Sequence, residues 1–339
     1  MTKIKIIMME KRSTLVLLVL CTLVLTAYIT SGDLSDLPPL ANNTELSEKI
    51  SDYHIFDGPI AALKPAADFK EYQLTATLFT DYAEKQRLVK VPIGSKLTAV
   101  TNGLPDFPDG TILVKTFYYY HDKRDTSRGK QVIESRVMIR HDSRWSAGTY
   151  QWNKEQTEAF LVTRGLNLPV SWLDKDGNSQ SISYHIPKTG ECATCHNADN
   201  KFMPIGPKIR NLNRDIMSGK GPVNQLTYLQ EAGILNKTAP ASFQKLSNWE
   251  DKSLPVEDRA RAYLDINCAH CHSEQGYCSG SRLKLGYELA FEHTRIAHQA
   301  GRIDRFLSKK TMPMLGTTIV DKEGLELIRE YINTVKVKR

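Results

Sequence analysis

The sequence has few cysteines, no basic block and no apolar run of full membrane-spanning length, and each shortage excludes a class of protein. Six cysteines in 339 residues are too few for a disulfide scaffold of this size. The net charge is a modest +7, and basic residues do not cluster with aromatic ones, so nucleic acid is not an expected partner. A hydrophobic fraction of 41% and a charged fraction of 24% are typical of a globular protein with ample core.

The N-terminus has the pattern of an export signal. Lys11 and Arg12 precede an almost purely apolar run over residues 15–29. A run of about 15 residues is short for a membrane span and typical of the apolar region of a signal peptide. Residues 1–32 are therefore predicted to be a signal peptide or an N-terminal anchor. Because no Ala-x-Ala cleavage site is present, anchoring to the membrane through this segment stays open.

Four of the six cysteines lie in two copies of one motif, Cys192-Ala-Thr-Cys195-His196 and Cys268-Ala-His-Cys271-His272. Cys-x-x-Cys-His is the attachment sequence of c-type haem, in which two thiols bond the two vinyl groups of the porphyrin. The following histidine is then the proximal ligand of the iron. The sequence thus predicts two covalent c-type haems, with His196 and His272 as iron ligands.

Two other interpretations of the cysteine pairs are weaker. A tetrahedral zinc site would use both pairs, but their separation is long for a zinc ribbon. A redox-active dithiol is the second alternative, and neither pair lies in a thioredoxin-like pattern. The histidine after each pair favours haem. Cys278 has no evident partner and is interpreted as an ordinary thiol.

The chain before the first motif has a β texture. Residues 33–64 are polar and predict a linker, and residues 65–187 are predicted to form a β-rich domain. Short alternating or β-branched runs separated by turn residues favour an antiparallel sandwich or a small barrel. The predicted strands are 72–79, 87–91, 111–120, 131–140, 149–153, 159–163, 170–173 and 181–186.

After this domain the predicted texture becomes helical. Residues 188–250 form the first haem segment, with helices expected at 208–217 and 224–232. Residues 251–339 carry an amphipathic helix over 257–268 and a closing helix that begins after Asp321 as its N-cap. The predicted fold class is therefore α+β: an N-terminal antiparallel β-sandwich or barrel-like domain followed by a mostly α-helical dihaem region.

The order of features in residues 251–339 resembles a small class I cytochrome c domain: a helix, the haem motif, a loop with Met-Pro, and a last helix. By this resemblance Met312, directly before Pro313, is the distal ligand of the second iron, with Met314 as its rival. A thioether opposite histidine raises the reduction potential. For the first haem the sixth ligand stays open among Met203, Met217, His185 and no protein ligand at all.

Larger blocks extend the resemblance to a family of exported bacterial dihaem c-type cytochromes of unassigned role. The resemblance covers nearly everything after about residue 65, and it implies two covalent haems and a periplasmic location, either soluble or anchored to the inner membrane. The matching blocks are 78–83, 107–111, 150–153, 206–213, 224–226, 259–272 and 312–317.

Electron transfer between redox partner proteins in the periplasm is the predicted function, carried by the four haem cysteines, His196, His272 and Met312. The alternative is a dihaem peroxidase or an oxidase subunit whose first haem keeps an open iron site. No acid–base pair for peroxide chemistry can be assigned from the sequence. Whether the chain is an enzyme is therefore left uncertain, and an electron carrier is favoured over a catalyst.

Overall fold

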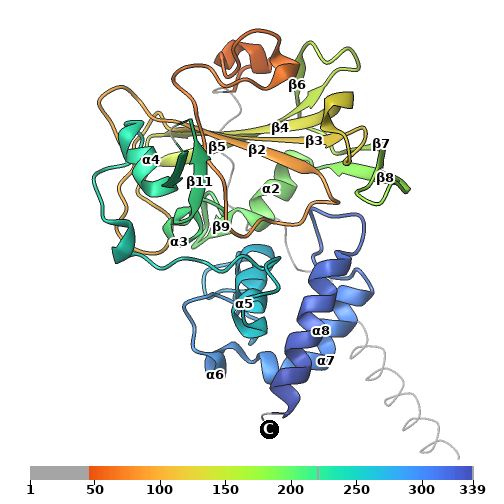
Figure 1. Cartoon of the computed structure of the whole chain (residues 1–339). Coiled ribbons are helices and arrows are strands. Elements are labelled where there is room, and N and C mark those ends of the chain that lie inside the picture. The colour runs from red at the N-terminus through yellow and green to blue at the C-terminus, as the bar shows by residue number, and fades with distance from the viewer. Residues whose placement is uncertain (1–45, 220, 338–339) are drawn as a thin grey trace, which may run out of the picture. The chain divides into compact units, whose positions relative to one another are not determined.

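A computed structural model describes residues 46–219 and 221–337, which are built around one antiparallel sheet (Figure 1). The export signal predicted for residues 1–32 lies outside the described residues. The sheet has six strands in sequence order, so each strand pairs with the next one along the chain. They are β1 (Lys70–Glu71), β2 (Glu84–Lys90), β3 (Ile112–Tyr120), β4 (Lys130–His141), β5 (Arg144–Trp152) and β6 (Ala159–Val162).

The remaining strands form three separate hairpins, and the helices follow them. The hairpins are β7 (Leu166–Leu173) with β8 (Ser179–Ile186), β9 (Asn197–Ala198) with β10 (Lys201–Phe202), and β11 (Asp215–Ser218) with β12 (Gly221–Asn224). The α-helices are α2 (Thr189–Cys195), α3 (Ile209–Leu212), α4 (Gln225–Glu231), α5 (Val256–Asn267), α6 (Phe291–Thr294), α7 (Ile296–Ser308) and α8 (Lys322–Val337). Single 3-10 turns are η3 (Ile50–Tyr53), η4 (Ile60–Ala62), η5 (Thr126–Arg128) and η6 (Pro240–Ser242).

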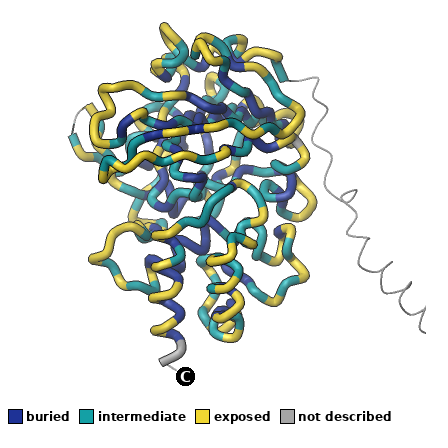
Figure 2. Tube along the Cα trace, turned by 90° about the vertical axis from the view of Figure 1, so that its right-hand side faces the viewer, coloured by how far each residue is buried: buried dark blue, intermediate teal, exposed yellow. Residues whose placement is uncertain are grey.

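Alternation along the central strands gives the sheet two buried faces. Side chains of successive strand residues point to opposite faces, so Leu113 and Val114 of β3 belong to different hydrophobic clusters. The turn between β4 and β5 places Asp142 and Ser143 in the left-handed region, at φ 46° and 61°, as a two-residue hairpin requires. Figure 2 shows the buried positions running along these strands.

Different segments cover the two faces. The chain from Ile50 to Phe69 packs on one face, against Leu88, Val114 and Val137. On the other face, α2, β10, α3 and α4 pack against sheet residues that include Val89 and Leu113. The β7–β8 hairpin covers the rest of that second face. The segment that carries the first motif is therefore packed on this second face of the sheet.

The C-terminal helices α5, α7 and α8 share a separate core. Tyr263, Ile303 and Tyr331 are among its buried members. α8 begins after Asp321, whose Oδ1 accepts a hydrogen bond from Gly324 N at 2.9 Å, so the predicted N-cap is confirmed. Among the described residues, the helices are all too short or too polar to traverse a bilayer.

The predicted sandwich or barrel is wrong. The strands predicted at 111–120 and 131–140 exist as β3 and β4, but they belong to one open sheet whose second face is covered by helices, loops and a hairpin. The strand predicted over 72–79 is a loop. Its backbone is held by Asn211 and Asn267 side chains, which accept from Ala76 N at 2.9 Å and Phe79 N at 2.8 Å, instead of by a strand ladder.

The predicted mostly helical region after residue 188 is wrong as well. Only Ile209–Leu212 of the helix expected at 208–217 is helical, and Asp215–Ser218 pairs with Gly221–Asn224 as a hairpin. α3 ends after one turn, where Asn213 N donates to Ile209 O at 2.9 Å, and the following residues pair with β12 as a strand instead of continuing the helix. Helices occupy less than half of this region, and loops with short strands fill the rest.

Candidate cofactor site

The first motif lies on α2, between the β8 strand and the β9–β10 hairpin. Lys188 N donates to the Glu191 carboxylate at 2.9 Å, which is one half of a capping box and starts the helix just before Cys192. Ala193 is buried against the sheet, so α2 packs on the sheet through the face that carries this residue. The last turn closes with His196 N donating to Cys192 O at 2.9 Å. This turn holds the two thiols and the histidine in one short unit.

The His196 ring is held in the state that iron ligation requires. Its Nδ1 donates to Met203 O at 2.9 Å, and Met203 N donates back to His196 O at 3.0 Å. The ring stacks on Phe202 with 5.4 Å between centroids. Burial lowers the pKa of His196 to about 3, so the imidazole is neutral at pH 7. With Nδ1 protonated, the free lone pair is on Nε2, which is the atom that a proximal ligand uses.

The second motif follows α5 directly. Cys268 N donates to Leu264 O at 3.0 Å, and His272 N donates to Cys268 O at 2.9 Å, so this motif also forms a closed turn. His272 O accepts from Leu285 N at 2.8 Å, and its Nδ1 faces the Leu283 backbone without reaching full hydrogen-bond geometry. Burial lowers the pKa of His272, which again favours the neutral, ligating form.

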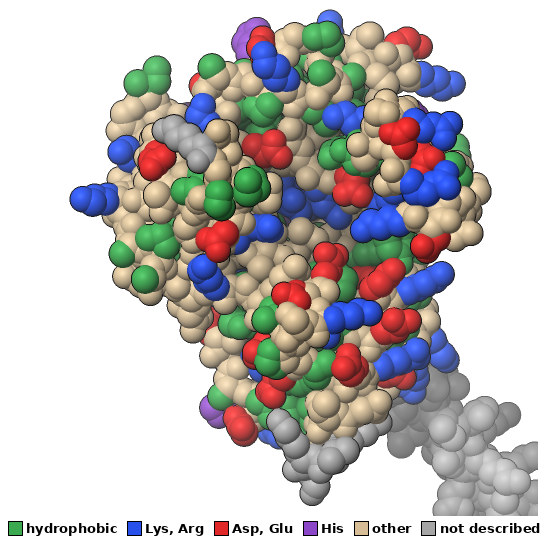
Figure 3. All heavy atoms as spheres, viewed as in Figure 1, with side chains coloured by type: hydrophobic (Ala, Val, Ile, Leu, Met, Phe, Trp, Pro, Cys, Tyr) green, Lys and Arg blue, Asp and Glu red, His purple; other side chains and the backbone are tan. Residues whose placement is uncertain are grey.

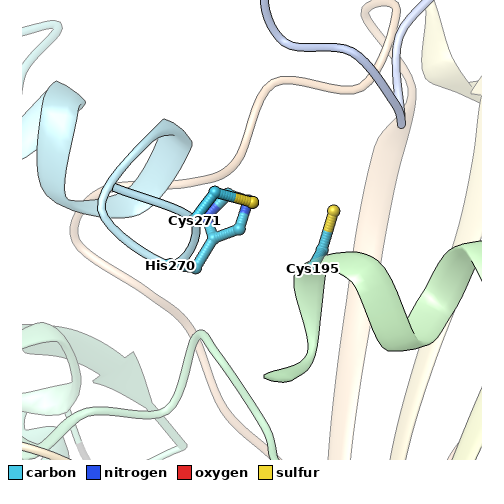
Figure 4. A group of neighbouring side chains, drawn as sticks. All are labelled: Cys195, His270 and Cys271. Atoms are coloured by element: carbon cyan, nitrogen blue, oxygen red, sulfur yellow. The ribbon is translucent and has the colours of Figure 1, made fainter. Parts of the chain in front are cut away.

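The two motifs meet, although 76 positions separate Cys192 from Cys268 in the sequence. The ligand atoms of Cys195, His270 and Cys271 all lie within 4.8 Å of one another (Figure 4). A backbone hydrogen bond joins the loops behind the motifs, from Asp199 N to Gln275 O at 3.1 Å. The close approach is therefore built into the backbone and does not depend on side-chain rotamers alone.

The two facing thiols have opposite proton affinities. A hydrogen bond from Cys271, assisted by His270, lowers the pKa of Cys195 below its usual value. The same hydrogen bond raises the pKa of Cys271. All four motif cysteines and Cys278 are free thiols. A thiolate next to a thiol is a reactive pair, available for thioether formation or for metal binding.

A buried ion-pair network joins the helix before the second motif to the segment after the first motif. Asp265 of α5 is 1% exposed and accepts from Arg210 Nη2 at 2.9 and 3.1 Å and from Lys208 Nζ at 3.0 and 3.2 Å. Arg210 is fully buried, and it also pairs with Glu288. The carboxylate therefore connects the helix before the second motif to the α3 segment that follows the first motif.

The predicted sixth ligands stay predictions, but their surroundings differ. Met312 is half-buried, whereas Met314 is 48% exposed, as expected if Met312 is the one that binds inside the protein. For the first motif, Met217 is 77% exposed. His185 is bonded at both ring nitrogens, to Asn167 at 2.8 Å and to Glu191 at 3.1 Å. The backbone oxygen of Met203 accepts a hydrogen bond from Nδ1 of His196, the predicted proximal ligand.

Three features of the site were not found from the sequence. They are the position of His270 beside Cys195 and Cys271, the hydrogen bond between His196 and the backbone oxygen of Met203, and the ion-pair network around Asp265. The sequence Cys268-Ala-His270-Cys271 does indicate that His270 lies near the motif thiols, because a residue between two cysteines of one turn is held close to them. The Met203 and Asp265 roles depend on tertiary contacts that leave no local pattern.

The donor set and its geometry fit covalent haem. Each motif is a closed turn with two free thiols and one neutral histidine. A four-cysteine zinc site fits less well, because only Cys195 and Cys271 of the four join His270 in the cluster found among residues 46–219 and 221–337. No family model, no curated protein and no solved structure matches this chain. The assignment therefore depends on the residues themselves.

Proposed function

We propose that this chain is an exported dihaem c-type cytochrome that transfers electrons between redox partner proteins. One haem is attached through Cys192 and Cys195 with His196 as ligand, and the other through Cys268 and Cys271 with His272 as ligand. Covalent haem supplies an iron that takes up and releases one electron at a potential set by its ligands and surroundings. The proposed location is the periplasm, since c-type haem is attached after export.

The approach of the two motifs is the observation that carries the proposal. A relay needs its two centres close together and held rigidly. Cys195 and Cys271, the second cysteine of each motif, lie within 4.8 Å of each other, and the Asp199–Gln275 backbone hydrogen bond fixes the loops behind them. Both His196 and His272 are partly buried, and this desolvation lowers the pKa of each imidazole and so favours its neutral form. The chain thus supplies two equivalent attachment units side by side.

The test is haem stoichiometry in a host that matures c-type cytochromes. We expect two haems per chain in the wild type, measured by absorbance of the denatured protein and by intact mass. Cys192→Ala with Cys195→Ala should remove one haem, and Cys268→Ala with Cys271→Ala should remove the other. The matched control Cys278→Ala, a half-buried thiol outside the motifs, should keep both. A colourless wild type with the mass of the bare polypeptide would refute the proposal.

The alternative function, a dihaem peroxidase or oxidase subunit, has one supporting observation. Of the three candidates for the sixth ligand of the first iron, Met217 is exposed, His185 is hydrogen-bonded at both ring nitrogens, and Met203 bonds His196 through its backbone oxygen. Electron paramagnetic resonance separates the two functions. Two low-spin ferric centres fit a relay, and a high-spin centre that binds peroxide or cyanide fits an open catalytic iron.

A metal site without haem is the remaining chemistry of this cluster. Cys195, His270 and Cys271 offer sulfur and imidazole ligands, which suit zinc. This use excludes haem attachment, because a thioether sulfur no longer provides a thiolate. Elemental analysis of the matured protein decides between them: iron at two per chain supports the haem proposal, and stoichiometric zinc with no iron contradicts it.

A further inference from the structure

A row of basic side chains crosses the sheet face that carries the first motif. The strand register places Arg87 of β2 opposite Lys115 of β3, and Lys115 opposite Arg136 of β4. Arg136 is in turn opposite Thr149 of β5. Like charges directly opposite one another on neighbouring strands destabilise a sheet. The row therefore has a cost in folding free energy unless an anion compensates for it.

The protein neutralises only one end of this row. Glu134 is fully buried and pairs with Arg136, with 2.6 Å between Oε1 and Arg136 Nη2. Arg87 is 7% exposed, and its Nη2 is buried without a hydrogen-bond partner. Lys115 makes no hydrogen bond or ion pair among the described residues; its Nζ only lies over the Phe117 ring, 4.6 Å from the centroid. Arg87 thus lacks an anionic partner, and so does Lys115, which is partly buried and whose pKa is held well below its usual value by burial and by repulsion from Arg87.

The row begins beneath the first motif and leads away from it. α2 packs against β5, so the motif lies over the Thr149 end. Burial raises the pKa of Cys192, and a hydrogen bond with Thr149 and the charge of Arg136 oppose this rise. From β5, each strand step covers about 4.8 Å, so Lys115 is about 10 Å and Arg87 about 14 Å from the motif end.

A cavity lies near the Arg87 end of the row. Lys85 is two residues before Arg87 on the same face of β2, and it lines a cavity of about 1200 Å³. Burial, with repulsion from Arg87, lowers the pKa of Lys85 to about 7. Figure 3 shows basic side chains gathered in a hollow near the centre of the viewed surface of the molecule.

We propose that Arg87 and Lys115, with Arg136 beside them, bind the two propionate carboxylates of the haem attached to the first motif. This inference rests on the proposed function. Thioethers and propionates leave a porphyrin at opposite edges, so the propionates of a haem bound at Cys192 and Cys195 extend away from the motif. The two unpaired cations match the two carboxylates in number, and both are desolvated, which makes charge-assisted hydrogen bonds strong.

The test uses the reduction potentials of the matured dihaem protein. Lys115→Met and Arg87→Met each remove one positive charge near one haem, so the ferrous form of that haem loses stability. We expect its ferric–ferrous equilibrium to shift about tenfold toward ferric, a fall of about 59 mV for a one-electron couple. The potential of the other haem should stay unchanged, and Lys115→Arg should retain the wild-type value.

The matched control is Lys90→Met, on the same strand as Arg87 but on the opposite face, where Lys90 pairs with Asp68. It should leave both potentials unchanged. Unaltered potentials in Lys115→Met and Arg87→Met, with two haems still present, would overturn the inference and leave the proposed function standing. Absence of haem from the wild type would instead refute the proposed function.

The alternative ligand of this row is a soluble anion that carries a carboxylate or phosphate group. The wild-type potential is therefore also measured against added acetate and inorganic phosphate at constant ionic strength. Independence of both anions supports binding of the propionates. A saturable shift that Lys115→Met abolishes would show that the row is open to a soluble anion, and would overturn the assignment to the haem.

Discussion

The Asp265 carboxylate offers the sharpest stability test, because it is buried and shared by two cations. Asp265→Asn keeps the shape of the side chain and removes its charge, leaving Arg210 fully buried with only Glu288 as an ion-pair partner. Removal of one partner from a buried ion pair costs about 3–5 kcal/mol. Since Glu288 remains, we expect the lower end of this range. At about 2 °C per kcal/mol for a chain of this size, the melting temperature should fall by about 6 °C.

The assay is thermal unfolding of the holoprotein by circular dichroism at pH 7. Asp304→Asn is the matched control, because Asp304 forms an ion pair with Arg329 that is largely exposed, with side-chain exposures of 39% and 50%. Exposed pairs are worth about 0–1 kcal/mol, so the control should lose at most about 2 °C. Equal melting temperatures for Asp265→Asn and the wild type would show that the buried network adds nothing to stability.

The difference in stability between the wild type and Asp265→Asn should change with pH in a defined direction. Burial raises the pKa of Asp265, but Lys208 and Arg210 outweigh it, so the pKa lies below the ordinary value of 3.8. A carboxyl whose folded-state pKa is depressed stabilises the fold above its unfolded-state pKa and loses that contribution as the pH falls through the folded-state value. The gap between the wild type and Asp265→Asn should therefore be constant near neutral pH and close below about pH 4.

Three further predictions concern the motif surroundings. Met312→Leu should abolish the sulfur-to-iron charge-transfer band and lower one reduction potential, whereas Met314→Leu should change neither; a surviving band in Met312→Leu would exclude it as ligand. Met203→Leu should leave the haem spectrum intact, at a cost below about 1.5 kcal/mol, because only its backbone oxygen is used; a spectral change would make its sulfur a ligand. Gly276→Ala should destabilise the second motif by about 1–3 kcal/mol, since a Cβ would lie 2.5 Å from the Cys271 oxygen, while Gly280→Ala, with open space around it, should melt like the wild type.

The candidate attachment residues could be predicted from the sequence because haem attachment is a local requirement. Two thiols and an imidazole must lie within one turn, so Cys192, Cys195 and His196 form a readable motif without any knowledge of the fold. Their relation to Cys271 could not be predicted in this way. It depends on tertiary contacts, among them the backbone hydrogen bond between Asp199 and Gln275, neither of which belongs to a motif.

The fold was predictable only at the level of single strands. Alternation along β3 identifies a strand with two distinct faces, but the pattern of Leu113 and Val114 is the same whether a second sheet or a helical segment covers a face. The sandwich prediction failed on this ambiguity. The segment over 72–79 failed for a different reason, because the side chains of Asn211 and Asn267 replace a neighbouring strand as its hydrogen-bond partners.

The contact between the motifs is a property of the whole chain and not of either motif. The sheet fixes α2 through Ala193, and the Asp265 network fixes α5 against the segment that follows the first motif. Because these two supports are independent, loss of either one should loosen the approach of Cys195 to Cys271 while leaving the attachment turns intact. The proposed haem count and the proposed communication between the haems therefore have separate origins: the first depends on local spacing, and the second depends on an ion-pair network that joins Asp265 to Lys208 and Arg210, which are distant from it in the sequence.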